Sequence, residues 1–382
     1  MPTPCQNLIA DVHACQQRCV LAVTGGGSTA IGQLLASPGA SRTVLEAVVP
    51  YSNTALTDWL QCAAEQACSA ATARAMAMAA WMRARQLDPE TDPHQLIGLG
   101  ATASLVSDRP KKGNHRIHVA TQTATVTTVT TLELAKDQRD RLAEEALAAQ
   151  LVLLTLAKTS AVDITSAQSH FNEQLLPQET VASVLQQAEE SWTALLLSQA
   201  SHVCYPNPFS PQAILCGAFN PPHDGHRRMA AHAAQRLGCP VDWELSITNV
   251  DKPPLDFVEI EQRLGWLHGE TTSERTVLTD APTFRAKSQL FPGCTFVVGA
   301  DTIARVGDPK YYSGESGTFD AAIGQIATHG CRFLVFGREI DGNFQVVSDL
   351  DLPAPLRDLC DEVPGAEFRE DISSTQLREN RS

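Results

Sequence analysis

Two histidines stand three residues apart in the segment Gly217-Ala-Phe-Asn-Pro-Pro-His-Asp-Gly-His226. A short apolar run, 213–216, precedes the segment, and an amphipathic helical pattern follows it. If the helix begins near Gly225, both His223 and His226 lie beside its N-terminus. Free backbone N–H groups at a helix N-terminus attract anions. Gly217 and Gly225 would let the backbone approach a ligand closely. The pattern therefore predicts a phosphate site.

Two other interpretations of the histidine pair remain open. Histidines at this spacing can ligate zinc, but no H-E-x-x-H motif or cysteine pair supplies further ligands nearby. They can also be ordinary surface residues.

A second candidate for phosphate binding lies near the C-terminus, in Ile372-Ser-Ser-Thr-Gln-Leu-Arg378. Ser373 or Ser374 could cap a helix while Arg378 turns back over its first turn and, with Thr375, holds phosphate oxygens. Taken alone, the same pattern is also common at helix starts that have no function.

The two motifs together resemble the HxGH-type nucleotidyltransferases, particularly the nicotinate and nicotinamide mononucleotide adenylyltransferases. The resemblance covers residues 212–382 and implies a Rossmann-like domain with a mostly parallel sheet, which transfers a nucleotidyl group and releases pyrophosphate. It implies that His223 and His226 contact the triphosphate and, with Arg378, carry catalysis. The further nucleotide-binding residues that it implies are Gly217, Phe219, Asn220, Ser373, Ser374 and Thr375.

Two more residues are candidates for the same site. The segment Phe296-Val-Val-Gly-Ala-Asp301 resembles the strand end that approaches the nucleotide or acceptor in such enzymes, although a buried strand entering a turn would look alike. Lys252 follows a predicted strand and could reach a phosphate, or it could be a solvated loop lysine. Magnesium is expected on the ATP phosphates, with no dedicated metal site in the protein. Gln376 stands where the family often has a basic residue. The identity of the acceptor and the choice of ATP rather than CTP therefore rest on analogy with the family.

The N-terminal part resembles the C-terminal domain of CinA proteins, which includes nicotinamide mononucleotide deamidases. The resemblance rests on Pro38-Gly-Ala-Ser41 and Tyr51-Ser-Asn53. It implies a pocket with Ser41 and Tyr51, but Leu56 occupies the position of the family's lysine. A serine needs a base to become a nucleophile, so we expect a degenerate deamidase. The simpler alternatives are a helix cap for Ser41 and a packed aromatic ring for Tyr51.

The glycine triplet before Ser28 lacks the G-K-[ST] ending of a P-loop.

The elements that must position these residues alternate between strand and helix, which predicts two α/β domains. We expect a CinA-like domain at 1–160, a helical and Pro-rich linker at 161–211, and the nucleotidyltransferase domain at 212–382. The predicted strands are 20–23, 117–134 with one bend, 213–216, 242–247, 295–298 and 332–336. The predicted helices include 28–36, 60–85, 139–158 and 179–199.

The composition narrows the class of partner. The 382 residues carry 29 basic and 43 acidic side chains, a net charge of −14, with no basic block, so nucleic acid is not an expected partner. No apolar run of 18 residues and no signal-like N-terminus is present, so we expect a cytoplasmic protein without membrane contact. The 11 cysteines form no framework and are expected to be reduced. By analogy with CinA-like domains, a homo-oligomer is expected.

These observations predict an enzyme that transfers an adenylyl group from ATP to a pyridine mononucleotide. One alternative is a transferase that uses CTP or another phosphorylated acceptor. A second is a nucleotide-binding sensor without catalysis, and a third is a bifunctional enzyme that also deamidates.

Overall fold

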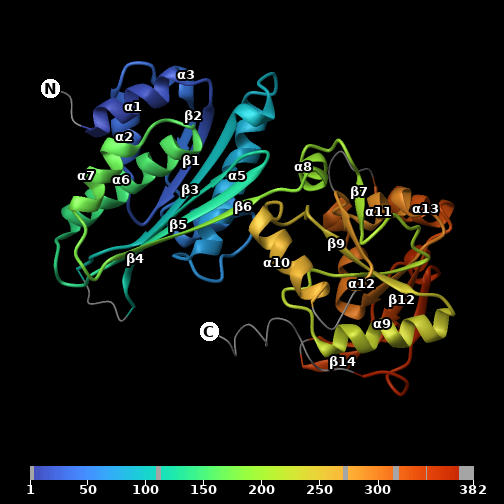
Figure 1. Cartoon of the computed structure of the whole chain (residues 1–382). Coiled ribbons are helices and arrows are strands. Elements are labelled where there is room, and N and C mark those ends of the chain that lie inside the picture. The colour runs from blue at the N-terminus through green and yellow to red at the C-terminus, as the bar shows by residue number, and fades with distance from the viewer. Residues whose placement is uncertain (1–3, 109–112, 270–273, 313–317, 341, 370–382) are drawn as a thin grey trace. The chain divides into compact units, whose positions relative to one another are not determined.

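The computed structural model describes residues 4–108, 113–269, 274–312, 318–340 and 342–369. The chain divides into two compact units. The first consists of Met1–Thr193 with Asp251–Glu259, and the second of Ala194–Val250 with Ile260–Ser382. Each unit is built on its own large β-sheet (Figure 1).

The first unit has a six-stranded mixed sheet in the order β2-β1-β3-β4-β5-β6. Strands β2, β1 and β3 are parallel, whereas β3, β4, β5 and β6 run antiparallel in succession. The strands are β1 (Arg18–Thr24), β2 (Val44–Val48), β3 (Leu96–Ser104), β4 (His115–Gln122), β5 (Val126–Leu134) and β6 (Thr180–Gln187).

Helices cover both faces of this sheet (Figure 1). The helices α1 (Pro4–Ala14), α2 (Thr29–Ala36), α6 (Arg141–Thr159) and α7 (Thr165–Glu173) share the larger apolar core with one face. On the other face lie α4 (Asn53–Leu60) and α5 (Ala70–Leu87). The short elements α3 (Ala40–Thr43), η1 (Pro93–Gln95) and α8 (Glu190–Leu196) complete the series.

Helix α5 lies directly against β3 because β3 presents glycines on that face. A Cβ atom on Gly98 would lie 2.1 Å from the carbonyl oxygen of Ala77, and one on Gly100 would lie 2.2 Å from that of Ala73. The alanines of α5 and the glycines of β3 therefore allow backbone-to-backbone packing, which no larger side chain would permit.

The second unit has a seven-stranded sheet in the order β15-β12-β11-β8-β9-β10-β7. All its neighbours are parallel except β7 and β10. Its strands are β7 (His202–Tyr205), β8 (Ala213–Cys216), β9 (Val241–Ser246), β10 (Thr276–Thr279), β11 (Thr295–Gly299), β12 (Arg332–Phe336) and β15 (Cys360–Val363). Counted from β8, the parallel strands follow the Rossmann order 3-2-1-4-5-6.

This sheet is also covered on both faces. Helices α9 (Asp224–Leu237) and α10 (Phe257–Leu267) contribute to one core, and α11 (Phe284–Leu290), α12 (Ala300–Val306), α13 (Phe319–Thr328) and α14 (Ala354–Arg357) to the other. The remaining elements are the hairpin of β13 (Arg338–Ile340) and β14 (Asn343–Gln345), η2 (Pro309–Tyr312) and η3 (Val347–Asp349). The predicted fold class, two α/β domains with a mostly parallel Rossmann-like sheet in the second, is confirmed.

The segment 161–211, predicted as a linker, differs from the prediction. Its part 180–187 is not helical but forms strand β6, which pairs with β5 along its whole length. The β-branched Thr180, Val181 and Val184 suit a strand, and pairing with β5 supplies the main-chain hydrogen bonds that a helix would otherwise make. Strand β7 belongs to the sheet of the second unit.

Within the described part of the chain, no helix is both long and apolar enough to cross a lipid bilayer.

Candidate active site

The candidate site lies where the strand order of the second sheet reverses. Strands β8 and β11 are neighbours there, and the chain leaves them in opposite directions, to β9 and to β12. The loops after the carboxyl ends of two such strands leave a crevice, which is where open α/β sheets bind ligands. Gly217 follows β8 directly, and Gly299 is the last residue of β11.

The two histidines lie at the start of helix α9, as the sequence predicts. His223 occupies the cap position and His226 the first turn, and their rings stack with centroids 3.7 Å apart. The backbone N–H of His223 donates to Nδ1 of His226 over 3.2 Å. Since Nδ1 of His226 accepts, the proton of its neutral ring is on Nε2, which leaves Nε2 as a hydrogen-bond donor.

Both histidines are held in the neutral form. Burial lowers the pKa of His226 to about 3, and the nearby His223, Arg338 and Arg227 act in the same direction. Burial and the charges of Arg338 and Arg227 also lower the pKa of His223, against the opposing effect of Asp224. Nδ1 of His223 is buried and has no hydrogen-bond partner among the described residues. This nitrogen is therefore available for a hydrogen bond to a ligand or a water molecule.

Phe219 supports the His226 ring from the core. Its side chain is 1% exposed, and its ring meets His226 edge-on at 5.3 Å and Trp243 at 4.7 Å. A Cβ on Gly217 would lie 2.7 Å from the Phe219 ring, so only glycine fits at this position. The sequence suggested that Phe219 lines the nucleotide pocket. The structure places it beneath Gly217, while Asn220 is half-buried in the same turn.

Arg263 of α10 fixes the same turn. Arg263 is 8% exposed, and its guanidinium donates to the carbonyl oxygen of Ala218 over 2.9 Å. The turn between β8 and α9 is therefore held from below by Phe219 and from the side by Arg263.

A cation that was not predicted from the sequence, Arg338, completes the cluster. It begins β13, two residues after the carboxyl end of β12. Its Nη2 lies 3.4 Å from Sδ of Met229, one turn beyond His226 on α9. On the β11 side, a Cβ on Gly299 would lie 3.0 Å from Cγ and Nε of Arg338 and 2.4 Å from Oδ1 of Asp301. The signal available in the sequence was its place just after the predicted strand 332–336, beside Gly337.

Arg338 has no carboxylate partner in the described parts of the chain, because none of the ion pairs found there includes it. Its positive charge instead acts on both histidines. An arginine in this position, beside a helix N-terminus and an unpartnered histidine nitrogen, favours binding of an anion.

The structure does not bring every predicted residue to this cluster. Lys252 is exposed and belongs to the segment Asp251–Glu259 of the first unit. Ser373, Ser374, Thr375 and Arg378 lie outside the described residues. Asp301 is exposed in the first turn of α12, close to Gly299. No group of three or more potential metal-binding side chains occurs in the ranges that the structure describes.

In the first unit, Ser41 and Tyr51 lie at opposite ends of β2. Ser41 is exposed in α3, which leads into the strand, and Tyr51 follows the strand and is 69% exposed. A five-residue strand spans about 16 Å, so the two side chains do not share one pocket within a chain. Leu56 is 4% exposed in α4 and packs with Ala22 and Met76. Ser41 is not a helix cap, because Gly39 holds that position, and the Tyr51 ring is not packed.

A carboxylate of the chain itself fills the glycine turn after β1. Glu145 of α6 accepts hydrogen bonds from the backbone N–H groups of Gly27 at 2.8 Å and Thr29 at 3.0 Å. The hydroxyls of Ser28 and Thr29 donate to the same carboxylate at 3.3 and 3.0 Å. Burial is the largest single effect on the pKa of Glu145 and acts to raise it, but the hydrogen bonds together outweigh burial and lower the pKa. The donors that a glycine turn would offer to a phosphate are thus already in use.

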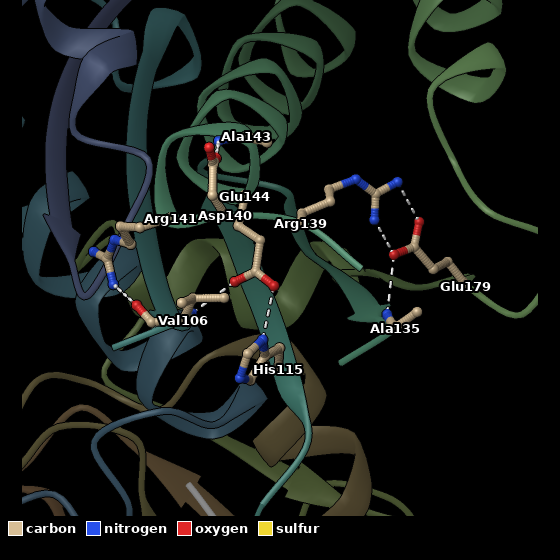
Figure 2. A network of polar contacts seen from close by, with 9 residues as sticks. All are labelled: Val106, His115, Ala135, Arg139, Asp140, Arg141, Ala143, Glu144 and Glu179. Atoms are coloured by element: carbon tan, nitrogen blue, oxygen red, sulfur yellow. Dashed lines mark hydrogen bonds and ion pairs between the residues drawn. The ribbon is translucent and has the colours of Figure 1, made fainter. Parts of the chain in front are cut away.

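The first turn of α6 also secures the neighbouring loop (Figure 2). Glu144 is fully buried and accepts from the backbone N–H of Val106 at 2.7 Å, and Nδ1 of His115 lies 2.7 Å from its other oxygen. Arg141 donates to the carbonyl oxygens of Val106 and Gly25. The loops after β1 and β3 are therefore tied to one helix start.

Comparison with known proteins finds a family that resembles most of the second unit. Residues 214–380 match the family described as cytidylyltransferase-like. Among solved structures, the competence/damage inducible protein CihA from Agrobacterium tumefaciens matches with 19% sequence identity and a TM-score of 0.31, covering 45% of this chain and 98% of that chain. No curated protein matches the chain. Residues 214–380 are therefore similar to a cytidylyltransferase-like domain, which supports a nucleotidyltransferase function for the second unit.

Proposed function

We propose that the protein transfers an adenylyl group from Mg·ATP to nicotinamide or nicotinate mononucleotide and releases pyrophosphate. The observation that carries the proposal is the cluster of His223, His226 and Arg338 at the N-terminus of α9, where the strand order reverses. It combines neutral hydrogen-bond donors with a cation that has no carboxylate partner among the described residues.

The reaction forms one bond and breaks one bond at the α-phosphorus. An oxygen of the acceptor phosphate attacks this phosphorus, and the bond from the phosphorus to the oxygen bridging the β-phosphate breaks. Pyrophosphate leaves with the electron pair. A phosphate monoester is already an anionic nucleophile at neutral pH, so the protein needs no general base. It has to align the two phosphates and offset the negative charge.

Each described residue of the cluster has a role in this step. His226 donates from Nε2 to an oxygen of the α-phosphate, and His223 uses its free Nδ1 toward the triphosphate. Arg338 neutralises charge on the phosphates, together with the free N–H groups of α9. From the motif at 372–378, we assign Arg378 and the hydroxyls of Ser373, Ser374 and Thr375 to the β- and γ-phosphates.

Magnesium would enter with ATP. The donor set fits this role, because the exposed carboxylate of Asp301 is the oxygen ligand that Mg²⁺ prefers, with phosphate and water supplying the rest. The bound ion would offset phosphate charge.

The pyridine mononucleotide is proposed from the sequence resemblances in both halves of the chain, and ATP from the motif at 217–226. A cytidylyltransferase-like family leaves CTP and other phosphorylated acceptors as the second candidate. The experiment is a panel of four nucleoside triphosphates against pyridine mononucleotides, a phosphopantetheine compound and sugar phosphates, with pyrophosphate release measured. Release with ATP and a pyridine mononucleotide supports the proposal, whereas release only with CTP or another acceptor overturns it.

For the first unit we propose a scaffolding role without deamidation. Three observations support it: Leu56 packs in the core, Ser41 and Tyr51 lie apart, and Glu145 fills the glycine turn. No amine is available at position 56 to activate a hydroxyl.

A further inference from the structure

Strand β6 is an edge of the first sheet with unusual exposure. It pairs with β5 on one side only, and seven of its eight residues are exposed. Val181, Val184 and Leu185 are 43%, 51% and 60% exposed. The described residues hold nine large exposed hydrophobic side chains, and this one strand carries three of them.

The strand lacks the features that normally protect an edge. Its sequence, Thr-Val-Ala-Ser-Val-Leu-Gln-Gln, contains no charge and no proline. Its pairing with β5 runs through eight consecutive residue pairs without a bulge. Natural edge strands usually carry lysine, proline or a bulge, because a flat, uncharged edge offers free N–H and C=O groups to another strand.

The strand is also fixed at both ends, so it needs no ordering before it pairs. At its start, the buried Glu179 forms an ion pair with Arg139 and accepts from the backbone N–H of Ala135 at 3.0 Å, as Figure 2 shows. At its end, the N–H of Ala188 donates to the carbonyl oxygen of Thr125 over 2.8 Å.

We propose that β6 is an association surface at which two copies of this chain pair edge to edge and antiparallel, about a two-fold axis. Identical strands related in this way present each other with matching donors and acceptors. Charge also favours a second copy. The chain carries a net charge of −14, so like charges brought together at the contact of two copies would repel, and β6 is an uncharged surface at which this local repulsion is avoided.

Pairing would cover apolar side chains on both faces of the extended sheet. Val181 and Leu185 face the α6 side, where they line a cavity of about 380 Å³ together with Leu151 and Leu154. Val184 also borders this cavity, but side chains alternate along a strand, so its side chain points to the other face, where Val184 pairs with Val129 of β5.

The test compares the full chain with the double variant Val184→Lys/Leu185→Lys. The matched control, Leu35→Lys/Leu87→Lys, adds the same two charges at hydrophobic side chains that are 56% and 40% exposed on helices. Light scattering after size exclusion gives the mass, and amide hydrogen exchange gives the protection of residues 180–187. Circular dichroism checks that each protein is folded.

We expect twice 41.1 kDa for the wild type and the control, and 41.1 kDa for the β6 variant. Amides of 180–187 should exchange more slowly at concentrations where the dimer forms. A monomeric wild type overturns the proposal. So does a dimer that the folded β6 variant leaves intact, or one without added protection in 180–187, since another surface or partner would then be responsible.

Discussion

At the scale of single residues, the two histidines of the candidate site are similar in type but differ in hydrogen bonding. Nδ1 of His226 is occupied by the N–H of His223, whereas Nδ1 of His223 is free among the described residues. The first arrangement fixes a tautomer and the second leaves an atom for a ligand. This difference explains how one motif can both fix the orientation of the His226 ring and bind a ligand through His223.

The neutral state of His226 predicts a dependence of stability on pH. Its pKa is about 3 in the folded chain, whereas an ordinary histidine, as in the unfolded chain, has a pKa of 6.5. Below pH 6.5 the unfolded chain therefore takes up a proton that the folded chain does not. This contribution to stability is complete above pH 6.5 and is lost as the pH falls toward 3.

The check is the free energy of unfolding in urea between about pH 7.5 and pH 5, a range that spans the ordinary histidine pKa. His226→Asn, whose amide oxygen can still accept from His223, should lose less stability over this range than the wild type. Equal losses in the two proteins would show that His226 is not held neutral.

Arg338 gives a second prediction at this scale. Arg338→Met keeps much of the side chain's length but removes its charge, so KM for Mg·ATP should rise on the order of tenfold to a hundredfold, as expected for a charge-assisted hydrogen bond. Arg332→Met, at the start of the preceding strand β12, serves as the control and should leave KM unchanged. An unchanged KM in Arg338→Met would exclude a phosphate contact.

At the scale of elements, the close packing of α5 on β3 is the most demanding feature of the first unit. Gly98→Ala would place a methyl group 2.1 Å from the Ala77 carbonyl oxygen. We expect a loss of about 1–3 kcal/mol or more in the free energy of unfolding, as in overpacked cores. Gly32→Ala in α2 meets nothing within 4 Å and should be neutral or stabilising by about 0.5–1 kcal/mol. If Gly98→Ala and Gly32→Ala changed the melting temperature equally, the close packing of α5 on β3 would be contradicted.

Elements with a clear pattern were predictable from the sequence. The strands 213–216 and 332–336 match β8 and β12, because continuous apolar runs end there at turn residues. The helix predicted at 139–158 corresponds to α6. By contrast, β3 was missed, since Gly98 and Gly100 resemble loop residues until α5 is seen against them. Strand β6 was predicted as helix because its pairing with β5 comes from distant residues.

In the candidate site, too, the residues predicted from the sequence are those that belong to a local pattern. The histidine pair was found from its spacing, because a glycine turn and a helix start are local features. Arg338 comes more than 100 residues later, and only the strand order brings it to α9. Glu145 is similar, since no local pattern indicates that it fills the turn at Gly27.

At the scale of the whole molecule, the two units differ in whether the polar groups of their glycine turns are available to bind a ligand. The candidate site of the second unit has an unpartnered histidine nitrogen and a cation without a carboxylate among the described residues. The glycine turn of the first unit already holds Glu145. Catalysis is therefore expected in the second unit alone.

This division predicts that the full chain releases no ammonia from nicotinamide mononucleotide above background. A coupled ammonia assay measures it, with Ser41→Ala as the control. Ammonia release that Ser41→Ala abolishes would show that the first unit deamidates despite Leu56 and Glu145.

The central claim is that the cluster at α9 transfers a nucleotidyl group, and its most direct test is pyrophosphate release from Mg·ATP with a pyridine mononucleotide, comparing the wild type with His226→Ala. We predict release by the wild type and a loss of about 10²–10³-fold in kcat in the variant, as for removal of one donor to a developing negative charge. The claim would be contradicted if the wild type released no pyrophosphate although it bound ATP, and if His226→Ala bound ATP with the same affinity. That result would indicate a nucleotide sensor instead.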